Sequence, residues 1–173
     1  MVPVLLVVFL YVMAHNVLYT YIASFLAPVG LDGSVSAVLL VFGVASLVSI
    51  WITGILIDRH LRLLMISSTA LFALAVLALG LLASLPVVVF LSAALWGLAF
   101  GGAASLLQTA ASNAAGDAVD SVQPVIVTVW NIGVAGGGAV GGLLLGGLGA
   151  SSLAWGTLVL LVVALLCVLP WPP

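Results

Sequence analysis

Two apolar runs decide the fold of this chain: VSAVLLVFGVASLVSIWITGILI at residues 35–57 and LMISSTALFALAVLALGLLA at residues 64–83. Each run is at least as long as the ~20 residues that an α-helix needs to cross the ~30 Å apolar core of a bilayer. The segment between them, DRHLRL at residues 58–63, holds the densest group of charges in the sequence. We therefore predict two transmembrane helices joined by a short charged loop.

The composition of the whole chain agrees with a membrane environment. Of its 173 residues 66% are hydrophobic and 3% are charged, whereas about 25% are charged in an ordinary globular protein. Two basic residues cannot form a phosphate-binding face, which excludes a nucleic-acid partner. Cys167 is the only cysteine, so an internal disulfide and a cysteine-based zinc site are excluded as well. We expect the lipid bilayer as the solvent of this chain, and neither a metal nor a cofactor.

The same pattern of long apolar runs and turn residues continues along the rest of the chain. Pro86 and Pro124 each stand where a new span is expected to begin, a position that proline suits. We predict an all-α membrane protein with a single six-helix transmembrane domain over residues 1–173. Its spans are expected at about residues 3–26, 35–57, 64–83, 86–110, 124–148 and 153–169.

The orientation of the chain follows from its two basic residues. Arg59 and Arg62 both lie in the loop between the second and third spans. The positive-inside rule places this loop in the cytoplasm, and an even number of spans then places both termini there too. We expect a multi-pass protein of the cell membrane, inner or plasma, with both termini cytoplasmic.

The first span carries a polar stripe. Tyr11, His15 and Tyr19 repeat every four residues, and Asn16 and Thr20 lie beside them, so all five are predicted to share one face of a helix. Such a stripe is expected to face a water-filled cavity or other helices and not lipid. Hydrogen bonds between helices, at about 0.6–2 kcal/mol each, are the alternative role for these groups.

Further polar or aromatic residues stand in the fourth and fifth spans. An aromatic ring or an amide there suits the wall of a binding cleft, while single hydroxyls such as that of Thr128 are better explained by packing. The candidate residues for a substrate cavity are His15, Asn16, Tyr19, Trp96, Gln108, Trp130 and Asn131.

Glycines in the fifth span form a second pattern. Gly133, Gly137 and Gly141 recur at every fourth residue, the small-xxx-small spacing that lets two membrane helices approach closely. Gly136, Gly138 and Gly141 also match a dinucleotide-binding fingerprint, but they lie inside an apolar span and not at a strand-to-helix turn. No motif supports catalysis, and we expect that the protein is not an enzyme.

One segment resembles a family signature. GILIDRHLR at residues 54–62 is similar to the loop motif G-x-L-x-D-R-x-G-R of the major facilitator superfamily, with Leu61 in place of the second glycine. LYTYIASFL at residues 18–26, LWGLA at 95–99 and WNIGVAG at 130–136 resemble the carboxyl-terminal half of its bacterial drug:proton antiporters, which export sugars, nucleosides and drugs. The resemblance runs from about residue 15 to residue 148.

This resemblance implies a fold and an activity. The chain would be the carboxyl-terminal half of a twelve-helix transporter of the bacterial inner membrane, built from two inverted three-helix repeats that work by alternating access. Gly54, Asp58, Arg59 and Arg62 would belong to the loop motif, whose charged positions brace one conformation on the cytoplasmic side. The implied partners are small-molecule substrates, protons, and a missing amino-terminal six-helix half or a second copy.

Two functions are compatible with these features. The first is a secondary active transporter, or half of one, for proton-coupled efflux of sugars, nucleosides or drugs. The predicted spans contain no Asp, Glu, Lys or Arg, so the coupling group is expected in the missing half, with His15 as the alternative. The second is a non-transporting membrane interaction or assembly protein, in which the glycine ridge of Gly133, Gly137 and Gly141 serves only association.

Overall fold

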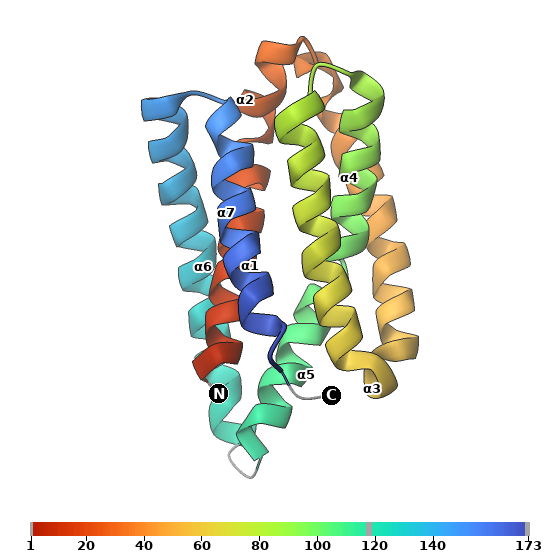
Figure 1. Cartoon of the computed structure of the whole chain (residues 1–173), viewed down its shortest axis with the longest axis vertical. Helices are drawn as coiled ribbons and strands as arrows, with labels where there is room; N and C mark the ends of the chain where they lie inside the picture. The colour runs from red at the N-terminus through yellow and green to blue at the C-terminus, as the bar shows by residue number, and fades with distance from the viewer. Residues whose placement is uncertain (1, 117–118, 172–173) are drawn as a thin grey trace.

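The computed structural model describes residues 2–116 and 119–171, and this part of the chain is all-helical (Figure 1). The predicted all-α class is confirmed, with several long apolar helices that suit a membrane. The elements are α1 (Val2–Thr20), α2 (Ile22–Leu26), the 3-10 turns η1 (Ala27–Val29) and η2 (Asp32–Ser34), α3 (Val35–Leu82), α4 (Pro86–Phe100), α5 (Ala103–Ala115), α6 (Val119–Leu148) and α7 (Ser151–Val168).

Helix α3 contains both of the apolar runs that were predicted as separate spans. Its backbone leaves helical geometry at His60, where φ is −133° and ψ is 29°. Figure 1 shows that the chain reverses direction there, so the two arms of α3 run in opposite directions. The charged segment 58–62 is thus a sharp bend and not an extended loop.

Length and apolar composition mark five helical stretches among the described residues as able to cross a membrane. One of these, Asp32–Leu82, has 51 residues. A straight helix of that length would measure about 75 Å, more than twice the ~30 Å of a bilayer core. The bend at His60 divides it into two arms that each match one crossing.

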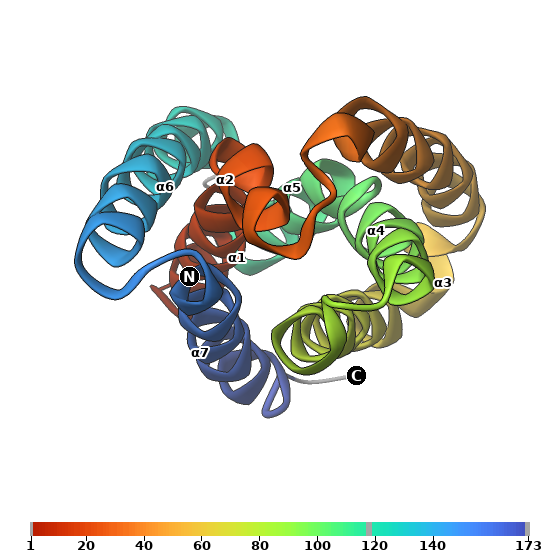
Figure 2. The same cartoon turned by 90° about the horizontal axis from the view of Figure 1, so that it is seen from above.

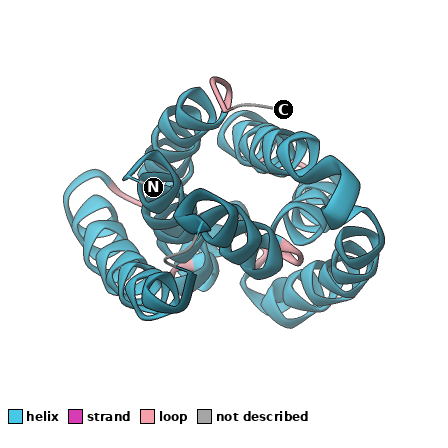
Figure 3. Cartoon of the chain, turned by 90° about the horizontal axis from the view of Figure 1, so that it is seen from below, coloured by secondary structure: helices cyan, strands magenta, loops and turns pink. Residues whose placement is uncertain are grey.

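The ends of the helices gather at the two ends of the bundle. The start of α1, the bend of α3 and the end of α7 lie at the same end, the lower one in Figure 1. Short connections join the helices, as the view from below in Figure 3 shows.

Helix α6 begins at Val119, and Pro124 therefore lies inside it and not at its first turn as the sequence suggested. A proline near the start of a helix removes only one backbone hydrogen bond.

The packing divides the bundle into two groups. Helix α1 packs mainly on α6 and α7, whereas α4 packs mainly on α3, and Figure 2 shows the same division from above. Both groups meet around Tyr11, Phe72 and Trp96, which are almost completely buried. Large apolar side chains stay exposed on the outside, among them Trp51 at 70% and Leu143 at 76%. Exposed apolar surface on this scale fits contact with lipid.

Two of the helix contacts are close because glycines leave room for a neighbouring backbone. On α6, a Cβ placed at Gly137 would lie 2.5 Å from Asn16 Cβ and 2.7 Å from the Met13 carbonyl oxygen of α1. On α4, a Cβ at Gly97 would overlap the Phe42 carbonyl oxygen of α3 and lie 2.9 Å from Ala45 Cβ. These distances are far below those of ordinary van der Waals contacts. The close approach of each helix pair therefore requires a glycine, which has no side chain, at the contact.

Candidate functional site

A recess lined by aromatic rings opens between four helices of the bundle. Its volume is about 430 Å³, within the usual range for small-molecule sites. Helices α1, α3, α4 and α6, with the start of α5, contribute to its wall. The lining residues are His15, Tyr19, Phe42, Ser46, Ile50, Phe100, Gly101, Ala104 and Trp130. We call this the aromatic recess.

His15 is the most constrained polar group of the aromatic recess. It is 8% exposed, and its ring stacks on Phe100 with the centroids 3.5 Å apart. The Tyr19 ring stacks on it at 5.0 Å. Behind the imidazole, Trp96 Nε1 donates a hydrogen bond of 3.2 Å to His15 Nδ1. The imidazole is therefore held in one orientation by stacking and by this bond.

A break in the helix next to His15 shapes the recess. Helix α4 ends at Phe100 and α5 begins at Ala103, with Gly101 and Gly102 between them. The Gly102 N–H donates to Ser49 Oγ of α3 at 3.1 Å. A backbone N–H released by a helix break is costly in lipid unless it finds such a partner.

The carbonyl before the break is also satisfied by side chains. The hydroxyls of Tyr11 and Ser68 lie 2.9 and 2.7 Å from the Ala99 carbonyl oxygen, and 2.7 Å from each other. Tyr11 comes from α1 and Ser68 from the second arm of α3. Hydroxyl groups from α1 and from both arms of α3 thus bond to the backbone groups at the break.

The candidate cavity residues reach different places in the structure. His15, Tyr19 and Trp130 line the aromatic recess, and Trp96 supports it from behind. The other three lie elsewhere: Asn16, Gln108 and Asn131 are not among the lining residues.

The amides that miss the recess have local roles. Asn16 faces α6 at Gly137 and donates from Nδ2 to the Val12 carbonyl at 2.9 Å. Asn131 Nδ2 donates to the Val127 carbonyl of its own helix at 2.8 Å. Gln108 lies exposed on α5. The polar stripe of α1 therefore does not share one environment: Tyr11 is 1% exposed and Tyr19 is 43% exposed.

Sequence reasoning missed several residues of the site. Phe42, Ser46 and Phe100 line the recess without having been predicted, and Ser49 supports the helix break. One signal was present in the sequence. Gly97 and Gly101 have the same four-residue spacing as the glycines of α6, and both face the first arm of α3.

The glycine ridge predicted in the fifth span is used inside the bundle. Positions 133, 137 and 141 of α6 all face α1 or Tyr21, the residue between α1 and α2. A Cβ at Gly133 would lie 3.2 Å from Val12 Cβ, and one at Gly141 would lie 2.7 Å from the Tyr21 ring. Tyr21 also donates from its hydroxyl to the Gly138 carbonyl at 2.8 Å.

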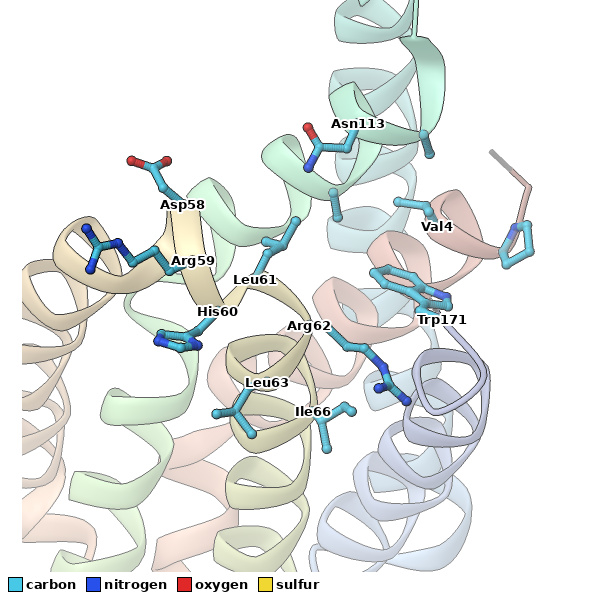
Figure 4. A pocket seen from close by; sticks show the side chains of 13 residues that line it. Val4, Asp58, Arg59, His60, Leu61, Arg62, Leu63, Ile66, Asn113 and Trp171 are labelled. Carbon is cyan, nitrogen blue, oxygen red and sulfur yellow. The ribbon is translucent and has the colours of Figure 1, made fainter. Parts of the chain in front are cut away.

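The charged segment lies around a second, larger hollow at the bend of α3. This hollow has a volume of about 760 Å³, and Asp58, Arg59 and Arg62 are among its lining residues. Figure 4 shows Asp58 and Arg59 on one side of the bend, whereas Arg62 points toward Trp171. Arg62 Nη2 donates to the Leu169 carbonyl at 2.9 Å, an interaction that favours a cation at the end of α7.

The remaining residue of the loop motif lies apart from these contacts. Gly54 is exposed on the first arm of α3, and a Cβ there would meet nothing within 4 Å. No close contact in the described structure therefore requires a glycine at position 54.

Comparison with known proteins points to transport. No family model matches the chain. It is 26% identical over 163 residues to a probable sugar efflux transporter of Mannheimia succiniciproducens, and this similarity covers 88% of the chain and 40% of that relative. The likeness is to a transporter. It supports a transport role in general, and the chain spans well under half the length of the relative that it matches.

Proposed function

We propose that this chain is a six-helix bundle of a major facilitator superfamily transporter and forms part of a pathway for the efflux of small solutes. The observation that carries this proposal is the aromatic recess, which is lined by rings from four helices and holds one imidazole in a single orientation. A related protein named as a probable sugar efflux transporter supports the same function.

The topology supports six crossings. The 51-residue stretch Asp32–Leu82 is bent back on itself at His60, and each arm is long enough to cross a bilayer. The start of α1 and the end of α7 share one end of the bundle (Figure 1), as an even number of crossings requires. Because the bend with Arg59 and Arg62 lies at this end, the positive-inside rule makes it the cytoplasmic end of a multi-pass cell-membrane protein.

The pattern of helix contacts supports two inverted repeats, because the first helix of each repeat packs on the other repeat. In the proposed division, α1 and the two arms of α3 form the first repeat, while α4 with α5, α6 and α7 form the second. The first helix of each repeat then packs on the second and third helices of the other. A pseudo-two-fold axis in the membrane plane produces this reciprocal arrangement.

The recess is suited to small neutral solutes that combine flat faces with oxygen atoms. Sugars offer C–H faces to aromatic rings and hydroxyls to polar groups, and nucleosides and many drugs offer comparable surfaces. The relative's name favours sugars among these. We propose that a further six-helix half, or a second copy, completes the cavity and supplies the group that couples transport to protons.

Efflux assays test this proposal. The intact gene product is expressed in cells loaded with a radiolabelled sugar, and the initial rate of release is compared with that of the His15→Leu variant. We expect release above that of cells without the protein, and a severalfold lower rate in the variant when the sugar is below its KM, because Leu removes both the stacking ring and the polar group. A rate unaffected by His15→Leu, at equal membrane abundance, would instead support the non-transporting assembly role.

A further inference from the structure

The bond between Trp96 and His15 has a chemical consequence for the recess. An indole N–H can only donate a hydrogen bond, so the imidazole nitrogen that it meets must be an unprotonated acceptor. In the structure this nitrogen is Nδ1, at 3.2 Å from Trp96 Nε1. A neutral imidazole carries its one proton on the other nitrogen in that case, and a doubly protonated ring would set two N–H groups against each other.

The second imidazole nitrogen of His15, Nε2, has no hydrogen-bond partner of this kind in the described part of the chain. Nε2 makes no hydrogen bond to any of the residues that the structure describes. It is also absent from the fully buried, unpaired polar atoms of this part of the chain. His15 lines the aromatic recess. The Nε2–H group is therefore available as a donor to a molecule in the recess.

One neighbouring polar group of the recess, the Ser46 hydroxyl, is already occupied. Ser46 Oγ donates to the Phe42 carbonyl of its own helix at 2.8 Å. The rings packed around the imidazole are Tyr19 of α1, Phe42 of α3, and Trp96 and Phe100 of α4, and Tyr19 is the titratable group among these four. No acidic side chain stands among the residues that line the recess.

We propose that Trp96 is a positioning residue, which holds His15 neutral with its proton on Nε2 and so presents the Nε2–H group as a hydrogen-bond donor to the solute. This inference rests on the proposed function and narrows its substrate class. A donor between aromatic rings, with no carboxylate nearby, selects a neutral solute that offers a hydroxyl, ether or carbonyl oxygen. An organic cation that offers only N–H groups is disfavoured, since it would bring donor against donor. His15 then binds solute and does not carry the transported proton.

Nitrogen NMR on the membrane-embedded, ¹⁵N-histidine-labelled protein tests the tautomer directly, and the His15→Gln variant assigns the signal. We expect one neutral species with the proton on Nε2 at pH 7. In Trp96→Phe, which keeps a ring but removes the donor, we expect the Nδ1–H tautomer or the protonated ring to appear. Trp51→Phe makes the same change at a residue that is 70% exposed and should leave the signal unchanged. A wild-type proton on Nδ1, or a tautomer unaltered by Trp96→Phe, would overturn the proposal.

Export kinetics provide a second readout that survives if Trp96→Phe fails to fold. Gln retains an amide N–H in place of Nε2–H, whereas Leu retains none. We expect KM for the labelled sugar to stay within about twofold of wild type in His15→Gln and to rise roughly 3- to 10-fold in His15→Leu, the change expected from one neutral hydrogen bond. Equal KM values in the two variants would refute the donor role. An Nε2–H signal in a protein that exports no sugar would refute the proposed function and leave the tautomer assignment standing.

Discussion

The contact between α1 and α6 offers the sharpest test of the packing, through two adjacent glycines. In Gly137→Ala the new methyl group would lie 2.5 Å from Asn16 Cβ and 2.7 Å from the Met13 carbonyl oxygen. Ordinary contacts between such atoms are about 3.5–4.0 Å, so the two helices must separate by roughly 1 Å. In Gly138→Ala the methyl group would meet nothing within 4 Å.

The two variants share one energetic effect, which cancels when they are compared. Replacing Gly by Ala inside a helix gains about 0.5–1 kcal/mol from backbone entropy. Overpacking at position 137 costs about 1–3 kcal/mol. We therefore expect Gly137→Ala to be less stable than Gly138→Ala by about 1–3 kcal/mol, and Gly138→Ala to be as stable as wild type or slightly more so.

Unfolding of the purified protein in mild detergent measures this difference, with helix content followed by circular dichroism as denaturant is added. Both variants keep the Gly138 carbonyl that accepts a hydrogen bond from Tyr21, so this bond does not distinguish them. Equal unfolding free energies for the two variants would refute the close approach of α1 and α6 at Gly137.

Two further substitutions probe the helix break and the recess. Ser49→Ala leaves the Gly102 N–H without its partner, and we expect a loss of about 1–3 kcal/mol in unfolding free energy. The Ser67 hydroxyl bonds to its own helix, so the control Ser67→Ala should cost less than about 1 kcal/mol. Equal losses in the two variants would contradict the role given to Ser49. Trp130→Leu removes a ring from the recess and should lower sugar export severalfold at equal membrane abundance, whereas Trp51→Leu, on the exposed surface, should not; equal export by both variants would place Trp130 outside the pathway.

The helical class was predictable because a bilayer imposes the length and composition of whatever crosses it. The apolar runs on both sides of the charged segment needed no tertiary information, since lipid leaves the backbone no partner outside a helix. The loop between them was less predictable, because a bend confined to one residue, His60, leaves no separate signal in the sequence.

The site was predictable only in part, because it depends on how each helix is rotated against its neighbours. His15 and Asn16 are adjacent in sequence and equally polar, yet His15 lines the recess and Asn16 faces Gly137. Hydropathy and spacing place both on one stripe, and only the close contact with α6 separates them.

The helix break at Gly101 and Gly102 shows the same limit. Glycines are common in unbroken membrane helices, as those of α6 demonstrate. What makes a break tolerable here is a set of hydroxyls from distant segments, at Tyr11, Ser49 and Ser68. No local pattern identifies these partners.

The most direct test of the central claim is the chemical accessibility of the aromatic recess in a sealed membrane. Single cysteines are placed in a Cys167→Ser background at Ala104, which lines the recess, and at Ala70, which is exposed on the second arm of α3. A water-soluble, membrane-impermeant thiol reagent requires a hydrated thiolate to react. We expect labelling at position 104, reduced by excess sugar, and none at position 70. An inert position 104 together with a reactive position 70 would contradict a solute pathway through the recess.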